Sequence, residues 1–134
     1  MDFYEQKNGT SCFVWACANC YIFNNKEYPS DRMIYDAMEI AKCFDGSTIE
    51  EEAVCDVFGL KFEETDCFDF VCRFSGIVTL NHPIYNLHAV FVYNNSDKYV
   101  VAVNSWLGPK VGVFNILELE QFSWRQGHLL NVSH

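Results

Sequence analysis

The sequence has little positive charge: nine Lys and Arg stand against eighteen Asp and Glu, a formal net charge of -9 at pH 7. Phosphates of nucleic acid and anionic lipid headgroups would be repelled by such a chain, so we expect neither a nucleic-acid nor a membrane partner. No stretch approaches the roughly 20 apolar residues of a membrane span. The first residues, MDFYEQKNGTSC, also lack the basic start and apolar run of a secretory signal. These absences predict a cytoplasmic protein.

The seven cysteines are an odd number and accompany no export signal, which favours free thiols over a disulfide framework. Cys17-x-x-Cys20 resembles half of a zinc knuckle, and Cys67 with Cys72 could supply the other half. That spacing is loose, and no second tight pair is present, so we expect no metal and no other cofactor. All but Cys12 are interpreted as buried or half-buried thiols of the protein body: Cys17, Cys20, Cys43, Cys55, Cys67 and Cys72.

The 134 residues contain no internal repeat, linker or low-complexity tract, and half of them are hydrophobic, so we expect one domain over 1–134. No feature specifies an oligomeric state. The first half has helical patterns and the second half has short β-branched and aromatic runs, which predicts an α+β fold with the first helix packed on an antiparallel sheet. Helices are predicted from residue 12 to 23, from 31 to 44, from 48 to about 59 and, less regularly, from 67 to 74. Ser30 and Asp31 can cap the second helix, which ends at Asp45–Gly46, and Ser47–Thr48 can cap the third. Strands are predicted at 76–81, 88–95, 98–106, 111–116 and 128–133, with a hairpin turn at 94–97.

Cys12 stands where a nucleophilic thiol is expected. Gly9 can supply a turn, Ser11 can cap the first helix, and the helical pattern begins at the cysteine itself. A helix N-terminus and a nearby imidazolium both lower a thiol pKa, and the thiolate is the reactive form. The position therefore predicts an activated cysteine, provided that a histidine on another element reaches it.

Among the four histidines, His88 is the best partner, because it opens the alternating strand HAVFVY. With the hairpin turn centred on residue 96, His88 and Asn104 fall opposite each other. Asn104 could then orient the imidazole, and Trp106 could shield that contact from water. His82 is interpreted as a loop residue and His134 as a frayed end, whereas His128 stays open.

These residues resemble the papain-like cysteine peptidases. That family has a glutamine six residues before its nucleophile (here Gln6), a His-Ala pair (here His88 and Ala89), and an asparagine within Asn-Ser-Trp (here starting at Asn104). Within that family, the short length of the chain and the order of its helices resemble most the compact bacteriocin-processing peptidases, which cleave double-glycine leaders. Viral leader proteases of the same fold are the next most similar group. The resemblance implies that Cys12 is the nucleophile and His88 the general base. It also implies that Asn104 is the orienter and that Gln6, beside the Cys12 backbone N–H, donates to the oxyanion.

The sequence departs from those relatives at three places. Asn104 stands where the compact members usually carry Asp, and Phe13 follows the nucleophile where tryptophan or glycine is usual. Leu107 separates Trp106 from the glycine, which comes only at position 108. We predict a papain-like cysteine peptidase that cleaves a peptide or isopeptide bond of a protein or peptide substrate through an acyl-enzyme. Two alternatives stay open. One is acyl transfer or deamidation by the same residues, and the other is a virus- or phage-encoded effector that binds a host protein without catalysis.

Overall fold

The computed structural model describes residues 2–6, 11–42, 48–84, 86–124 and 127–134, and all structural statements below refer to these residues. The helices are α1 (Cys12–Asn25), α2 (Asp31–Ala41), α3 (Thr48–Val57), α4 (Phe68–Arg73) and α5 (Ile116–Glu120). The strands are β1 (Glu64–Thr65), β2 (Ser75–His82), β3 (Asn86–Asn94), β4 (Tyr99–Val103), β5 (Val111–Asn115) and β6 (His128–Leu130). None of the helices in this part of the chain has the length and hydrophobicity to span a bilayer.

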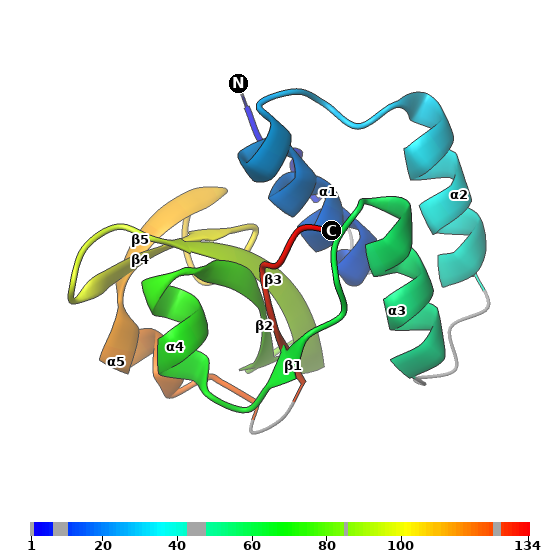
Figure 1. The fold of residues 1–134 in the computed structure, drawn as a ribbon. Helices are drawn as coiled ribbons and strands as arrows, with labels where there is room; N and C mark the ends of the chain where they lie inside the picture. The colour runs from blue at the N-terminus through cyan, green and yellow to red at the C-terminus, as the bar shows by residue number, and fades with distance from the viewer. Residues whose placement is uncertain (1, 7–10, 43–47, 85, 125–126) are drawn as a thin grey trace.

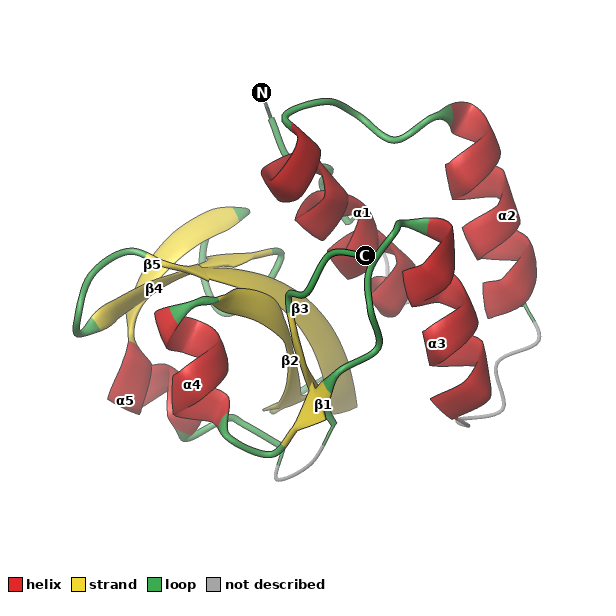
Figure 2. Cartoon of the chain, in the orientation of Figure 1, coloured by secondary structure: helices red, strands yellow, loops and turns green. Residues whose placement is uncertain are grey.

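The strands form one antiparallel sheet in the order β1-β6-β2-β3-β4-β5. Helices α1, α2 and α3 gather on one side of this sheet, whereas α4 and α5 lie on the other (Figures 1 and 2). The expected α+β fold, with N-terminal helices on a C-terminal antiparallel sheet, is therefore confirmed. Helix α1 packs on the sheet, as the sequence predicted, and its contacts are mainly with β3.

Alternation along the strands divides the core into two layers. One face of the sheet contributes Ile77, Phe91, Val103 and Leu129 to a core shared with α1 and α3. The opposite face contributes Val78, Leu80, Val90, Val92, Val100 and Ala102 to a core shared with α4 and α5. Because both faces are covered, the central strands are almost continuously apolar, which explains their uninterrupted hydrophobic runs in the sequence.

Local signals set most element boundaries. Ser30 caps α2 by accepting a hydrogen bond from the Met33 N–H at 3.2 Å, as predicted. Gly59, with φ 70°, turns the chain after α3. Asn115 caps the short helix α5 by accepting hydrogen bonds from the N–H groups of Leu117 and Glu118. The predicted end of the second helix at Asp45–Gly46 and the cap at Ser47 lie outside the described residues.

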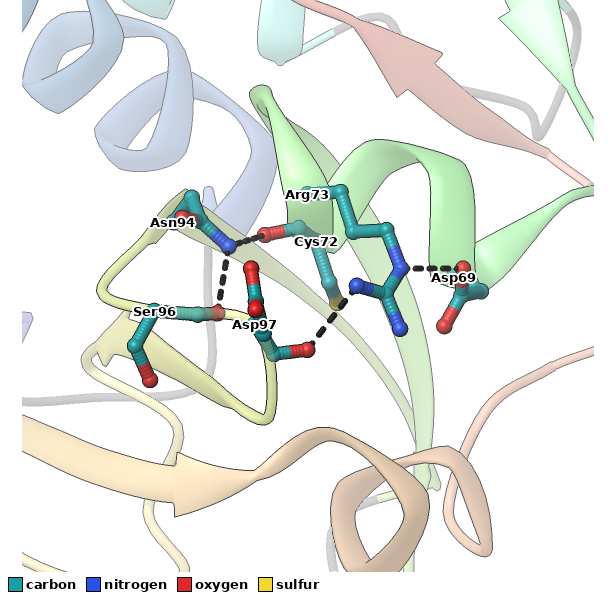
Figure 3. A network of polar contacts seen from close by, with 6 residues as sticks. All are labelled: Asp69, Cys72, Arg73, Asn94, Ser96 and Asp97. Atoms are coloured by element: carbon teal, nitrogen blue, oxygen red, sulfur yellow. Dashed lines mark hydrogen bonds and ion pairs between the residues drawn. The ribbon is translucent and has the colours of Figure 1, made fainter.

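The end of the β3–β4 hairpin is fastened to α4 by polar contacts (Figure 3). The Arg73 guanidinium donates to the Asp69 carboxylate at 2.7 Å and to the Asp97 backbone carbonyl at 2.9 Å. Asn94 Nδ2 donates to the carbonyls of Cys72 and Ser96 at 3.2 and 2.9 Å. The predicted hairpin turn is present, and it occupies residues 95–98 between β3 and β4, at the opposite end of β3 from His88.

The register of this hairpin differs slightly from the predicted one. Asn94 pairs with Val100 and Phe91 with Val103, so the turn is centred on residue 97 rather than 96. Continued beyond the last pair, this register sets His88 opposite residue 106 instead of residue 104. Two-residue strand β1 was not predicted, because so short an extended segment has no periodicity of its own.

Candidate active site

Residues 104–106 leave β4 in a sharp turn that creates the candidate active site. Asn104 and Trp106 both have φ 60°, in the left-handed region that L-residues seldom adopt, and Ser105 between them is fully buried. Asparagine tolerates this conformation, but a tryptophan there is a genuine outlier. Such strain is usually found at functional sites, where the surrounding contacts hold it in place.

His88 is nearly inaccessible, with 2% of its surface exposed, and its ring is held on two sides. Its Nε2 lies 2.6 Å from the backbone carbonyl oxygen of Asn104, so Nε2 carries the proton and donates it. The Trp106 indole stacks on the imidazole with centroids 4.0 Å apart and planes 12° apart. This arrangement fixes the ring and leaves Nδ1 as the unprotonated nitrogen.

The environment of His88 favours the neutral imidazole. Burial lowers the pKa of His88, and the hydrogen bond to the Asn104 carbonyl opposes this only in part, while nearby His82 lowers the pKa further. At neutral pH, His88 is therefore an uncharged base with Nδ1 available to accept a proton.

The Asn104 side chain points to the N-terminal segment and binds it. Its Nδ2 donates to the Tyr4 carbonyl at 2.8 Å, and its Oδ1 accepts from the Gln6 N–H at 3.2 Å. Sequence analysis placed Asn104 near His88, which the structure confirms, but left open which atom makes the contact. The backbone carbonyl makes it, and the carboxamide holds the segment that carries Gln6.

Cys12 begins α1, but its surroundings differ from the expectation. Ser11 adopts φ 62° and makes no side-chain capping bond, so the predicted cap is wrong. Burial raises the pKa of the Cys12 thiol above its ordinary value of 9.0; the backbone amides of Ala89, Phe13 and Cys12 lower it less, and Glu51 raises it. The prediction of a lowered pKa is thus not met, because desolvation outweighs the helix terminus.

The structure brings the four predicted residues to one region. Gln6 and His88 both bond to Asn104, and the Cys12 sulfur lies beside the amide of Ala89, the residue that follows His88. No hydrogen bond joins the Cys12 thiol to the His88 ring among the contacts of the described residues. The thiol and the base are therefore neighbours with neutral resting states rather than a preformed ion pair.

Three further residues support the site and were not identified from the sequence. Asn19, fully buried on α1, accepts from the Tyr4 N–H at 2.7 Å and donates to the Tyr4 carbonyl at 3.2 Å. Lys110 Nζ donates to the Phe3 carbonyl at 3.1 Å. His82 is the buried last residue of β2, so its interpretation as a loop residue is wrong. Its Nδ1 accepts from the Ile84 N–H at 3.1 Å, so its Nε2–H donates to the Trp106 carbonyl at 3.2 Å. Of these three residues, only Asn19 could have been identified from the sequence, because it is a polar residue in an apolar stretch of the predicted first helix.

The other histidines lie outside the site. His128 is buried in β6, where its Nδ1 accepts from the Thr79 N–H at 3.0 Å and its ring meets the edge of Phe68. His134 is held rather than frayed, since its N–H donates to the Gly59 carbonyl at 3.1 Å and its ring lies 3.5 Å from Asp56.

The remaining cysteines have structural positions. Cys17 and Cys20 lie in the core beside Cys55 on α3, and burial raises the pKa of both. Cys72 belongs to the core on the other face of the sheet. Cys67 is exposed just before α4, so the expectation of a buried or half-buried thiol is wrong for this residue. Cys43 lies outside the described residues, and within those residues no group of His, Cys, Asp and Glu is arranged to hold a metal ion.

The arrangement of helices and sheet is the papain-like fold in its compact form. The chain is similar in structure to the peptidase domain of Streptococcus ComA, a bi-functional ABC transporter involved in a quorum-sensing pathway. The two chains superpose with a TM-score of 0.67 over 95% of this chain and 96% of that domain, at 12% sequence identity. No protein-family model and no curated protein matches the sequence. The likeness therefore establishes the fold, as the sequence resemblance predicted, and not the chemistry.

Proposed function

We propose that the protein is a cysteine peptidase in which Cys12 is the nucleophile and His88 the general base and acid. The observation that carries the proposal is that Asn104 joins His88 to the segment bearing Gln6, while the Cys12 sulfur lies beside the peptide that follows His88. Residues from four separate parts of the chain thus meet where one reacting carbonyl could be held. The similarity to a peptidase domain supports a peptide as the substrate class.

The proposed reaction follows from the protonation states. His88 Nδ1 accepts the thiol proton as the Cys12 sulfur bonds to the carbonyl carbon of the scissile amide. The resulting oxyanion accepts hydrogen bonds from the Gln6 side chain and the Cys12 backbone N–H. Collapse of this intermediate breaks the C–N bond, and His88 returns the proton to the departing amine. His88 then deprotonates a water molecule, which attacks the thioester, releases the acid and regenerates the thiol.

A neutral thiol beside a neutral imidazole is consistent with this general-base route, because the proton needs to move only when substrate is bound. The same observation also fits a catalytically silent binding protein, which has no need of a thiolate. Hydrolysis is therefore the property that separates the two functions.

The test is hydrolysis of a peptide panel that includes sequences with two glycines before the scissile bond, followed by mass spectrometry. Cleavage by the wild type and its loss in Cys12→Ala support the proposal, with Cys67→Ala, which alters an exposed thiol elsewhere, as the matched control. Addition of an amine acceptor reveals acyl transfer as a product of different mass. Equal cleavage by wild type and Cys12→Ala, or cleavage by neither, would contradict the proposal.

A further inference from the structure

We propose that Asn104 is a positioning residue for Gln6, with its carboxamide, and for His88, with its backbone carbonyl. The inference rests on the proposed function for its kinetic consequences, but its structural basis is independent of activity. It assigns the side chain of Asn104 to the oxyanion-binding half of the site rather than to the imidazole.

The Asn104 carboxamide fits the extended N-terminal segment. Nδ2 donates to the Tyr4 carbonyl at 2.8 Å and Oδ1 accepts from the Gln6 N–H at 3.2 Å, so one planar group satisfies both polar groups that flank Glu5. The carboxamide thus offers one donor and one acceptor to the extended backbone, as the edge of a neighbouring β-strand does. The donor and acceptor also fix the orientation of the amide, since a reversed carboxamide would set like groups against each other.

The N-terminal segment is also held by Asn19 and Trp106, so the contacts of Asn104 add to an existing set of hydrogen bonds. The carboxamide of Asn19 holds both polar groups of Tyr4, and Trp106 Nε1 donates to the Gln6 carbonyl at 3.3 Å. Asn104 and Gln6 are each only 5% exposed, so a lost hydrogen bond would leave buried groups unpaired. Of the residues that make these contacts, Asn104 also accepts a hydrogen bond from His88, whereas Trp106 contacts His88 by stacking.

The backbone of Asn104, and not its side chain, holds His88. With φ 60°, Asn104 turns its own carbonyl to within 2.6 Å of His88 Nε2, and its N–H donates to the Lys110 carbonyl at 2.7 Å. Substitution of the side chain leaves that carbonyl in place, and glycine adopts this φ without steric cost. Asn104→Gly therefore removes the contacts to Tyr4 and Gln6 while keeping the one to His88.

The kinetic test combines Gln6→Ala and Asn104→Gly singly and together. Loss of one oxyanion donor lowers kcat by roughly 100- to 1000-fold, which is expected for Gln6→Ala. We expect Asn104→Gly to lower kcat by roughly 10- to 100-fold with KM little changed, because Gln6 is displaced. In the Gln6→Ala background, Asn104→Gly should cost less than about 2-fold, and the acidic limb of the pH profile, set by His88, should not move in either background.

Asn86→Gly is the matched control, since Asn86 is exposed and has φ 63°, so the same substitution is made in the same backbone conformation. It should leave kcat and the pH profile unchanged. Asn104→Asp keeps the acceptor for the Gln6 N–H and loses the donor to Tyr4, so its kcat should lie between those of the wild type and Asn104→Gly.

Two measurements on the Cys12→Ser background need no turnover. Hydrogen exchange of the Gln6 backbone amide should be faster with Asn104→Gly than without it. The ¹⁵N chemical shifts of the His88 ring should show the Nε2–H tautomer in both proteins. These readings hold even if no peptide is cleaved, so they separate failure of this inference from failure of the proposed function. A changed tautomer, a shifted acidic limb, full additivity with Gln6→Ala, or unaltered exchange at Gln6 would overturn the inference.

Discussion

The pH dependence of Cys12 alkylation follows directly from the burial of the thiol. Burial raises the pKa of Cys12 above 9.0, so deprotonation is disfavoured in the folded state. At pH 7 a thiol with a pKa of 9.0 is about 1% thiolate, and Cys12 should be less ionised than that. Because only the thiolate reacts, the rate of alkylation by iodoacetamide should rise about tenfold per pH unit between pH 7 and 9.

The assay follows the intact mass of a variant in which the exposed Cys67 is replaced by Ser, and Cys12→Ser in the same background supplies the blank. His88→Ala should leave the slope between pH 7 and 9 unchanged, because the lowered pKa of His88 keeps the ring neutral throughout this range. A plateau of reactivity that extends below pH 6.5 and disappears in His88→Ala would refute the reasoning. It would show a thiolate–imidazolium pair in the resting protein.

Three predictions concern stability. Phe91→Ala, which removes a fully buried ring in contact with Phe3 and Phe23, should cost about 3–5 kcal/mol in urea unfolding, whereas Phe70→Ala, at a ring 43% exposed, should cost far less. Gly76→Ala sets a methyl group against the Leu129 carbonyl oxygen and should lower the free energy of unfolding by about 1–3 kcal/mol or more. Gly108→Ala should be tolerated, because the nearest atom to its methyl group, on the Phe114 ring, lies at 3.4 Å. Equal unfolding midpoints for the two variants would contradict this prediction. Burial raises the pKa of Cys72 to about 12, so the thiol ionises at a lower pH in the unfolded chain than in the folded one, and stability should fall as pH rises above 9. Cys72→Ala should therefore reduce the slope of the unfolding free energy against pH. An unchanged slope would show that Cys72 is not the source of this pH dependence.

The sequence predicted the fold well because its signals are local. The change from helical to alternating patterns, the cap at Ser30 and the turn at 94–97 each depend on neighbouring residues. The spacing of His88 and Asn104 was also informative, although the hairpin is centred one residue later than predicted. Trp106 reaches the imidazole from the turn that follows β4, where the register of the strands no longer applies.

The atomic roles within the site were not readable from the sequence, because they depend on contacts between distant residues. Asn104 and Gln6 are separated by 98 positions, and nothing near either one indicates that the carboxamide turns away from His88. The pKa of Cys12 is a second example. A helix start predicts a lower pKa, but the degree of desolvation is a property of the whole packed structure and here outweighs it.

Trp106 shows how the fold holds a strained turn at this site. A bulky residue at φ 60° costs roughly 1–3 kcal/mol, so the conformation persists only where other contacts offset it. Stacking on His88 contributes about 0.5–1.5 kcal/mol. Hydrogen bonds from the indole to Gln6 and from His82 to the Trp106 carbonyl contribute about 0.5–1.5 kcal/mol each. All three partners come from other segments, so this conformation is stable only with the N-terminal segment and strands β2 and β3 in place. The base and the segment bearing Gln6 are therefore positioned together, as one consequence of completed folding.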